Sequence, residues 1–154
     1  MKPLETTIEE VLRNAIQSEV ETRLYYQKMA ERAGSPEVNK RMLELADAEL
    51  VHRAKMERKY RETLKQEPPA PQPVTVELDA DIRALDMTRA LKLSLERERD
   101  SESYYRFMAE RAPADSDLAN LFFELADIEW KHKTDLQIEY ESTMNDPEQF
   151  LRDM

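Results

Sequence analysis

The sequence predicts an all-α protein, a four-helix bundle of two repeated helical hairpins that a long proline-rich crossover connects. Three observations predict it. First, the 154 residues include one glycine and no cysteine, whereas sandwiches and barrels need turn glycines. Second, two segments of the chain return about 80 residues later. Third, apolar residues recur at the three-and-four spacing of an amphipathic helix.

The composition also excludes several functions. Without cysteine, this sequence has no disulfide, thiolate catalyst, cysteine-bound zinc or iron–sulfur cluster. A formal net charge of −10 repels nucleic acid and anionic membranes, so we expect neither as a partner. We find no apolar run of signal-peptide or membrane-span length. We therefore expect a cytoplasmic protein.

The internal repeat defines the two hairpins. Residues 25–33 return as residues 104–112 with seven of nine positions identical, and residues 44–52 return as 124–132 with six of nine identical. We expect a single domain over residues 1–154, with repeat one at about 7–65, a linker at about 66–81 and repeat two at about 86–144.

The linker contains four prolines within residues 68–73, which favour extended chain over helix. At about 3.1 Å per residue it spans roughly 50 Å, the length of a 30-residue helix. It is therefore long enough to return along the bundle and make the second and third helices parallel. The alternatives are a flexible tether between independent hairpins and a homodimer that exchanges helix pairs.

Local signals predict where each helix begins and ends. A capping box opens helix one, a glycine ends it, and a Ser-Pro pair opens helix two. Aspartate or serine caps open the later helices, and proline follows the end of each. The tail from Glu148 to Met154 is expected to form at most a short turn. These signals are Thr6 with Glu9, Gly34, Ser35-Pro36, Asp86, Ala112-Pro113, Asp115 or Ser116, and Asn145-Asp146-Pro147.

A glutamate interrupts the apolar stripe near the middle of every helix. No arginine or lysine occupies these stripes, so four acids would meet without a basic partner, at a cost of several kcal/mol each. The chain's two histidines each follow one of these glutamates by three residues, on the same helical face. The stripes are Ile8, Leu12, Ala15, Ile16, Glu19, Tyr26, Met29; Val38, Met42, Leu45, Glu49, His52, Met56; Met87, Leu91, Leu95, Glu98, Tyr105, Met108; and Leu118, Phe122, Leu125, Glu129, His132, Leu136.

Four glutamates and two histidines form a ligand set for two metal ions. Carboxylate oxygens with one imidazole per ion suit iron or manganese and tolerate zinc, and two divalent cations would cancel the four negative charges. Glu49 and Glu129 could bridge or chelate, while Glu19 and Glu98 would each supply a terminal carboxylate. The predicted metal ligands are Glu19, Glu49, His52, Glu98, Glu129 and His132.

Two tyrosines, Tyr26 and Tyr105, follow Glu19 and Glu98 by seven residues, two turns along the same stripe. The simpler interpretation is a core tyrosine whose hydroxyl is hydrogen-bonded. The alternative, which makes them the candidate catalytic residues, is a tyrosine that hydrogen-bonds a metal ligand or supplies an electron.

With these motifs the chain resembles the ferritin-like di-iron carboxylate family, and specifically the rubrerythrin-type ferritin-like domain. The resemblance runs from about Thr7 to Glu141 and rests on Glu in helices one and three with Glu-x-x-His in helices two and four. It implies that the six predicted ligands hold two iron ions. The chain departs from rubrerythrins in lacking the four-cysteine rubredoxin site. Their extra glutamate, three residues after the helix-three ligand, is replaced by Ser101, with Glu102 one step further.

The resemblance favours an enzyme, a non-haem di-iron peroxidase that reduces peroxide or O2 as a Fe(II)-Fe(II) centre is oxidised. A separate donor protein or a small reductant would supply the electrons. The first alternative is a ferroxidase or iron-handling protein, closer to ferritins and bacterioferritins in its symmetrical ligand set. The second is a non-redox bundle in which zinc or manganese neutralises the buried acids. An oxygenase acting on an organic substrate is least favoured.

Overall fold

The computed structural model describes residues 7–79 and 84–144, which form four helices, α1 (Ile8–Glu31), α2 (Pro36–Leu64), α3 (Met87–Arg111) and α4 (Asp117–Met144). The described residues group into two compact units, Glu9–Asp86 and a second unit that contains α3 and α4. None of the described helices combines the length and the apolar character that crossing a bilayer requires. The predicted all-α class is confirmed.

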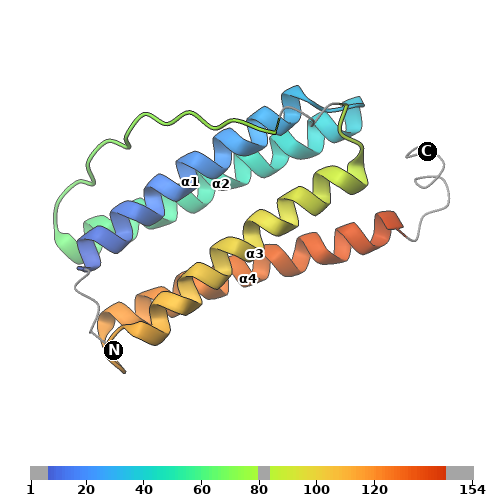
Figure 1. Ribbon diagram of the computed structural model, residues 1–154. Helices are drawn as coiled ribbons and strands as arrows, with labels where there is room; N and C mark the ends of the chain where they lie inside the picture. The colour runs from blue at the N-terminus through green and yellow to red at the C-terminus, as the bar shows by residue number, and fades with distance from the viewer. Residues whose placement is uncertain (1–6, 80–83, 145–154) are drawn as a thin grey trace. The chain divides into compact units, whose positions relative to one another are not determined.

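The first unit is an antiparallel hairpin of α1 and α2, which lie side by side in Figure 1. At one end the Asn39 side-chain amide donates to the Ala30 carbonyl over 3.0 Å. At the other end the Tyr60 hydroxyl donates to Glu9 Oε1, also over 3.0 Å. Because the two bonds join opposite ends of both helices, the pairing is antiparallel along its whole length.

The predicted start of α2 is confirmed. Ser35 is its N-cap, with φ −152° and ψ 160°, and the Ser35 hydroxyl accepts a hydrogen bond from the Val38 amide. Pro36 occupies the first turn, where its missing N–H is not needed. At the other end Lys65 caps α2 in the left-handed conformation and donates its N–H to the Arg61 carbonyl. The predicted cap of α1, Thr6, lies outside the described residues.

Gly34 has a different role from the one that the sequence predicts. No glycine has a positive φ among the described residues, so Gly34 is not a left-handed helix cap. The helix instead ends at Glu31, and the Arg32 and Ala33 amides close it by donating to carbonyls three residues back. A Cβ on Gly34 would lie 2.8 Å from the Ala84 carbonyl oxygen. The glycine is therefore required because the end of the linker passes too close for a side chain.

The linker returns along the first hairpin, as its length predicts, and Figure 1 shows it as a green loop beside α1. Gln17 holds it near the start: its side-chain amide donates to the Gln72 carbonyl over 3.1 Å and accepts from the Gln72 amide over 2.9 Å. At the far end Leu85, fully buried, accepts from the Gly34 amide and donates to the Arg32 carbonyl, both at 2.8 Å. The linker is thus a strap docked on the first hairpin at Gln72 and Leu85, and whether the two hairpins are independent stays a prediction.

The second unit is the antiparallel hairpin of α3 and α4. Thr88 near the start of α3 donates to Thr143 near the end of α4 over 3.2 Å. α3 begins directly after the predicted cap Asp86, and the Ser116 hydroxyl caps α4 by accepting from the Ala119 amide over 3.1 Å. Ser116, not Asp115, is therefore the cap of α4. The predicted stop at Asn145-Asp146-Pro147 and the tail lie outside the described residues, although α4 does end at Met144.

The core follows the predicted stripes with small shifts. Leu12, Met29 and Met42 are fully buried in the first hairpin, and Leu91 and Phe122 are buried in the second. Four predicted core positions are only half-buried, because the helix rotates smaller residues such as Ala46 and Ala109 into the centre. These positions are Ile8, Leu45, Met87 and Met108.

Candidate metal centre

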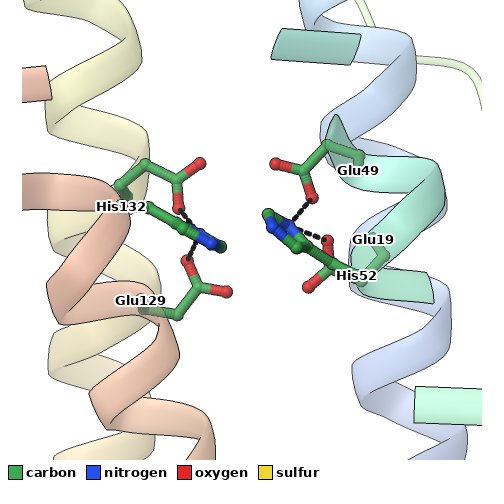
Figure 2. Close-up of polar contacts among 6 residues, drawn as sticks. Glu19, Glu49, His52, Glu129 and His132 are labelled. Carbon is green, nitrogen blue, oxygen red and sulfur yellow. Dashed lines mark hydrogen bonds and ion pairs between the residues drawn. The ribbon is translucent and has the colours of Figure 1, made fainter. Parts of the chain in front are cut away.

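The first hairpin brings together one glutamate of α1 and a Glu-x-x-His pair of α2. His52 Nδ1 lies 3.4 Å from Glu49 Oε2 and 3.8 Å from Glu19 Oε2. The ligand atoms of the three side chains all lie within 4.8 Å of one another. Figure 2 shows His52 joined to both carboxylates. The i,i+3 spacing places Glu49 and His52 on one face of α2, and the antiparallel pairing puts Glu19 at the same level.

The second hairpin repeats this group with α3 and α4. His132 Nδ1 lies 3.7 Å from Glu98 Oε2 and 3.8 Å from Glu129 Oε2. The ligand atoms of Glu98, Glu129 and His132 again lie within 4.8 Å of one another. The six residues that the sequence predicts as ligands therefore form two groups of three, one in each hairpin.

All four carboxylates are buried, with side chains 4–9% exposed, while the two imidazoles are 14% and 20% exposed. Burial is expensive for a carboxylate, and two carboxylates in one group also repel each other. In the second hairpin, burial and the neighbouring Glu98 together raise the pKa of Glu129 to about 9. Without a cation, this group therefore favours a protonated glutamate.

The same two glutamates also change the pKa of the imidazole in the second group. Burial lowers the pKa of His132, but the carboxylates of Glu129 and Glu98, 3.8 and 3.7 Å from its Nδ1, outweigh this effect and raise the pKa to about 10. Protons thus balance part of the charge when no metal is bound. One carboxylate oxygen, Glu129 Oε2, is buried and has no hydrogen-bond partner. A buried acceptor oxygen of this kind is suited to serve as a ligand for a cation.

The donor set of each group fits a divalent transition metal. At bond lengths of about 2.0–2.2 Å, neighbouring ligand atoms around one ion lie about 3.0–3.6 Å apart. The separations of 3.4–3.8 Å between histidine nitrogen and carboxylate oxygen need only a small contraction to reach that range. Two carboxylates and one imidazole suit iron, manganese or zinc.

Both candidate tyrosines are buried in the predicted stripes, Tyr26 fully and Tyr105 with 6% exposed. Each packs edge-on against the tyrosine that precedes it, with ring centroids 5.8 Å apart for Tyr25 and Tyr26 and 5.4 Å for Tyr104 and Tyr105. The repeat therefore extends to the aromatic neighbours. This packing fits the interpretation as core tyrosines, and a role beside the metal ligands stays a prediction.

Sequence reasoning missed a fifth buried glutamate, Glu102, which is 7% exposed. Its Oε1 lies 2.6 Å from Lys133 Nζ, and its Oε2 lies 2.6 Å from Arg106 Nε. Burial acts to raise the pKa of Glu102, but hydrogen bonds from Lys133 and Arg106 outweigh it and the pKa is lowered. The signal that could have found it was the i,i+4 spacing from Glu98, which places both acids on one face of α3.

Comparison with known proteins agrees with this geometry. A solved structure of an uncharacterized conserved protein from Magnetospirillum magnetotacticum MS-1 matches with a TM-score of 0.67 at 20% identity, over 89% of this chain and 95% of that one. No curated protein matches the sequence. The fold and the two Glu-Glu-His groups define a four-helix protein with two candidate carboxylate–histidine metal sites. The rubrerythrin family model matches residues 10–137, and the chain belongs to the rubrerythrin family.

Proposed function

We propose that the protein is a di-iron oxidoreductase of rubrerythrin type that reduces peroxide or O2. The observation that carries the proposal is the presence of two matching Glu-Glu-His groups, one in each hairpin of a rubrerythrin-family chain. Family membership supports metal binding by both groups. Four carboxylates would then balance the charge of two divalent ions, with one imidazole for each.

Bound iron supplies the two electrons that, with two protons, convert one peroxide molecule into two waters. The chain's residues have the other tasks. The buried carboxylates would balance the positive charge of the ions and keep the net charge low as the metals change oxidation state. Glu129, whose pKa burial raises to about 9, can hold a proton beside the site until metal displaces it. Tyr26 and Tyr105 are the candidates for hydrogen bonding to a ligand or supplying an electron.

Electrons would come from a separate donor protein or a small reductant, because these 154 residues contain no cysteine and hence no rubredoxin-type iron site. We expect the protein to work in the cytoplasm, where such reductants are available. Peroxide or O2 would be the oxidant.

A ferroxidase or iron-handling role is the second candidate. The observation that favours it is the symmetry of the two groups, since Ser101 stands where rubrerythrins have an extra glutamate, and Glu102 is paired with Arg106 and Lys133. Light scattering during size-exclusion chromatography separates the two functions. A cage of many subunits favours storage, whereas a monomer or dimer excludes a self-made cage.

The test of the proposed function is anaerobic loading with Fe(II), desalting, and a metal count, followed by stopped-flow mixing with peroxide. We expect about two irons per chain and oxidation faster than that of free Fe(II), with a new near-ultraviolet absorption band. Glu49→Ala and His132→Ala should each lower the metal count. Glu44→Ala, which removes an exposed glutamate of α2, is the matched control and should not. Retention of zinc without any redox reaction would replace the proposal with a non-redox metal-binding bundle.

A further inference from the structure

The second hairpin contains a chain of four charged side chains that crosses between its helices twice. Lys133 of α4 contacts Glu102 of α3, Glu102 contacts Arg106 one turn further along α3, and Arg106 Nη2 reaches Asp127 of α4 over 3.3 Å. We call these four residues, Glu102, Arg106, Asp127 and Lys133, the α3–α4 clamp. It fixes how α3 and α4 are aligned along their length.

The clamp lies on the helical turns that carry the metal ligands. Lys133 directly follows His132, Asp127 precedes Glu129 by two residues, and Glu102 follows Glu98 by one turn. A shift of α3 along α4 would therefore break the clamp and separate Glu98 from the other two ligands together. Because the ligand atoms come from both helices, their spacing depends on this alignment.

At Glu102 the clamp has the geometry of strong ion pairs, whereas its Arg106–Asp127 pair is exposed to water. Both oxygens of Glu102 accept a charge-assisted hydrogen bond at 2.6 Å, and the Glu102 side chain is 10% exposed. The lowered pKa of Glu102 keeps this carboxylate ionised and paired at neutral pH. A partly buried pair of this kind restrains its two side chains more than an exposed, solvent-screened pair does.

The first hairpin has no counterpart to the clamp at the equivalent positions. Arg23 stands at the position of Glu102 and Arg53 at that of Lys133, so two cations replace the central ion pair. Arg53 pairs along its own helix with Glu57, over 3.7 Å, and Arg23 Nε has no hydrogen-bond partner within the described part of the chain. Gln27 and Asp47 stand at the positions of Arg106 and Asp127.

The hairpins differ in the contacts that align their helices, and not in the net charge of these side chains. The clamp has two acids and two bases, and hence no net charge. In the first hairpin Arg23 and Arg53 are balanced by Asp47 and Glu57, whose own counterpart in α4 is the neutral Gln137. The two sets of four side chains thus have the same net charge, and they differ in whether their ion pairs join the two helices that carry each ligand group.

We propose that the α3–α4 clamp preorganises Glu98, Glu129 and His132, so that this group takes the first metal ion and the Glu19–Glu49–His52 group takes the second. Glu102, Arg106 and Lys133 are positioning residues in this scheme. A preorganised group binds more tightly, because less ordering remains to be done on binding. The inference rests on the proposed metal binding by both groups.

The test uses the full chain and Co(II), whose visible absorption reports binding at each group. His52→Ala leaves only the second hairpin's group complete, and His132→Ala leaves only the first. We expect Co(II) to bind the His52→Ala protein at least about tenfold more tightly than it binds the His132→Ala protein. Adding Glu102→Gln to His52→Ala should weaken binding about tenfold, at the lower end of what losing supporting contacts to a metal site costs. Arg53→Gln in the His132→Ala protein is the matched control, with less than a twofold effect.

A gain-of-function variant keeps the test decisive if Glu102→Gln does not fold. Arg23→Glu combined with Gln27→Arg, in the His132→Ala protein, supplies the first hairpin with the central acid and a second base. Tighter Co(II) binding, by about tenfold, supports the proposal. Equal affinities of the two groups, or no response to either set of variants, overturn the preorganisation proposal and leave metal binding intact. No Co(II) binding by the unmodified protein overturns the proposed function itself.

Discussion

The two hairpins share a ligand pattern and differ in what holds their helices. In the first, the Asn39–Ala30 and Tyr60–Glu9 hydrogen bonds join α1 to α2, and a docked strap ties the linker to the hairpin at Gln72 and Leu85. In the second, ion pairs between α3 and α4 have that role. The duplicated ligands thus occur in two different supporting structures. The lesson is that a repeat can keep its chemistry while the contacts that position it change completely.

Removal of metal should have the largest effect on stability, and it should destabilise both hairpins. Each ion that binds only the folded state adds about 2.7 kcal/mol at a hundredfold excess over its dissociation constant. We expect metal depletion with a chelator to lower the melting temperature strongly, and one equivalent of metal to restore about half of the loss. Calorimetry with stepwise metal addition measures this. An unchanged melting temperature after verified depletion would contradict two structural metal sites.

A dependence on pH should separate the hairpins in the metal-free protein. The folded-state pKa values of Glu129 and His132 are raised to about 9 and about 10, so the folded protein binds more protons than the unfolded chain between the ordinary and raised values. Stability from these groups is therefore present at low pH and is lost as pH rises through about 9, by at most about 1.4 kcal/mol per pH unit and group. Thermal melting in chelator between pH 6 and pH 9 measures the slope, and Glu129→Gln should flatten it.

The same protons must leave when metal binds, so metal affinity should move in the opposite direction and increase with pH. A metal affinity that is constant from pH 6 to pH 8 would show that Glu129 is already ionised without metal.

Gly34→Ala tests the end of the strap. The added methyl group would lie 2.8 Å from the Ala84 carbonyl oxygen, closer than real contacts allow, and the linker would have to move away. We expect a loss of about 1–3 kcal/mol and faster hydrogen exchange at the Leu85 and Gly34 amides. Hydrogen exchange measured by mass spectrometry should be as slow in α3 and α4 of the variant as in the original protein. A protein as stable as the original would show that the close approach is not required.

Gln17→Ala should have the smallest effect, because its two hydrogen bonds to Gln72 are exposed to water. We expect about 1 kcal/mol or less, together with faster proteolysis of the linker. The matched control is Gln137→Ala in the second hairpin, which removes an exposed bond to Glu141 on the same helix. Equal proteolysis of the original and Gln17→Ala proteins would mean that the linker is held by its ends alone.

The ligand groups could be predicted because their signal is local and repeated. Glu49 with His52 and Glu129 with His132 are three residues apart, and the apolar stripes show which face is buried. The cap of α2 was likewise visible as Ser35-Pro36, and the cap of α4 was narrowed to Asp115 or Ser116. Such features depend on a few consecutive residues, which is what a single sequence reports well.

The supporting contacts could not be predicted, because they join residues far apart in the chain. Nothing around Gly34 indicates that Ala84 passes beside it, 50 residues later. Glu102 looked like one acid among many on a charged helix, since its partner Lys133 lies on another helix. Leu45 and Met108 were expected in the core because they are apolar, and a modest rotation of each helix leaves them half-buried.

The strap has a consequence for synthesis on the ribosome. Leu85 completes the first compact unit, Glu9–Asp86, before any residue of α3 has been made. Translation at about 5–20 residues per second gives this unit several seconds to fold alone, far longer than helix formation and hairpin docking need. The first unit can therefore close before α3 and α4 have left the ribosome, which limits the time during which the apolar stripes of all four helices are exposed together.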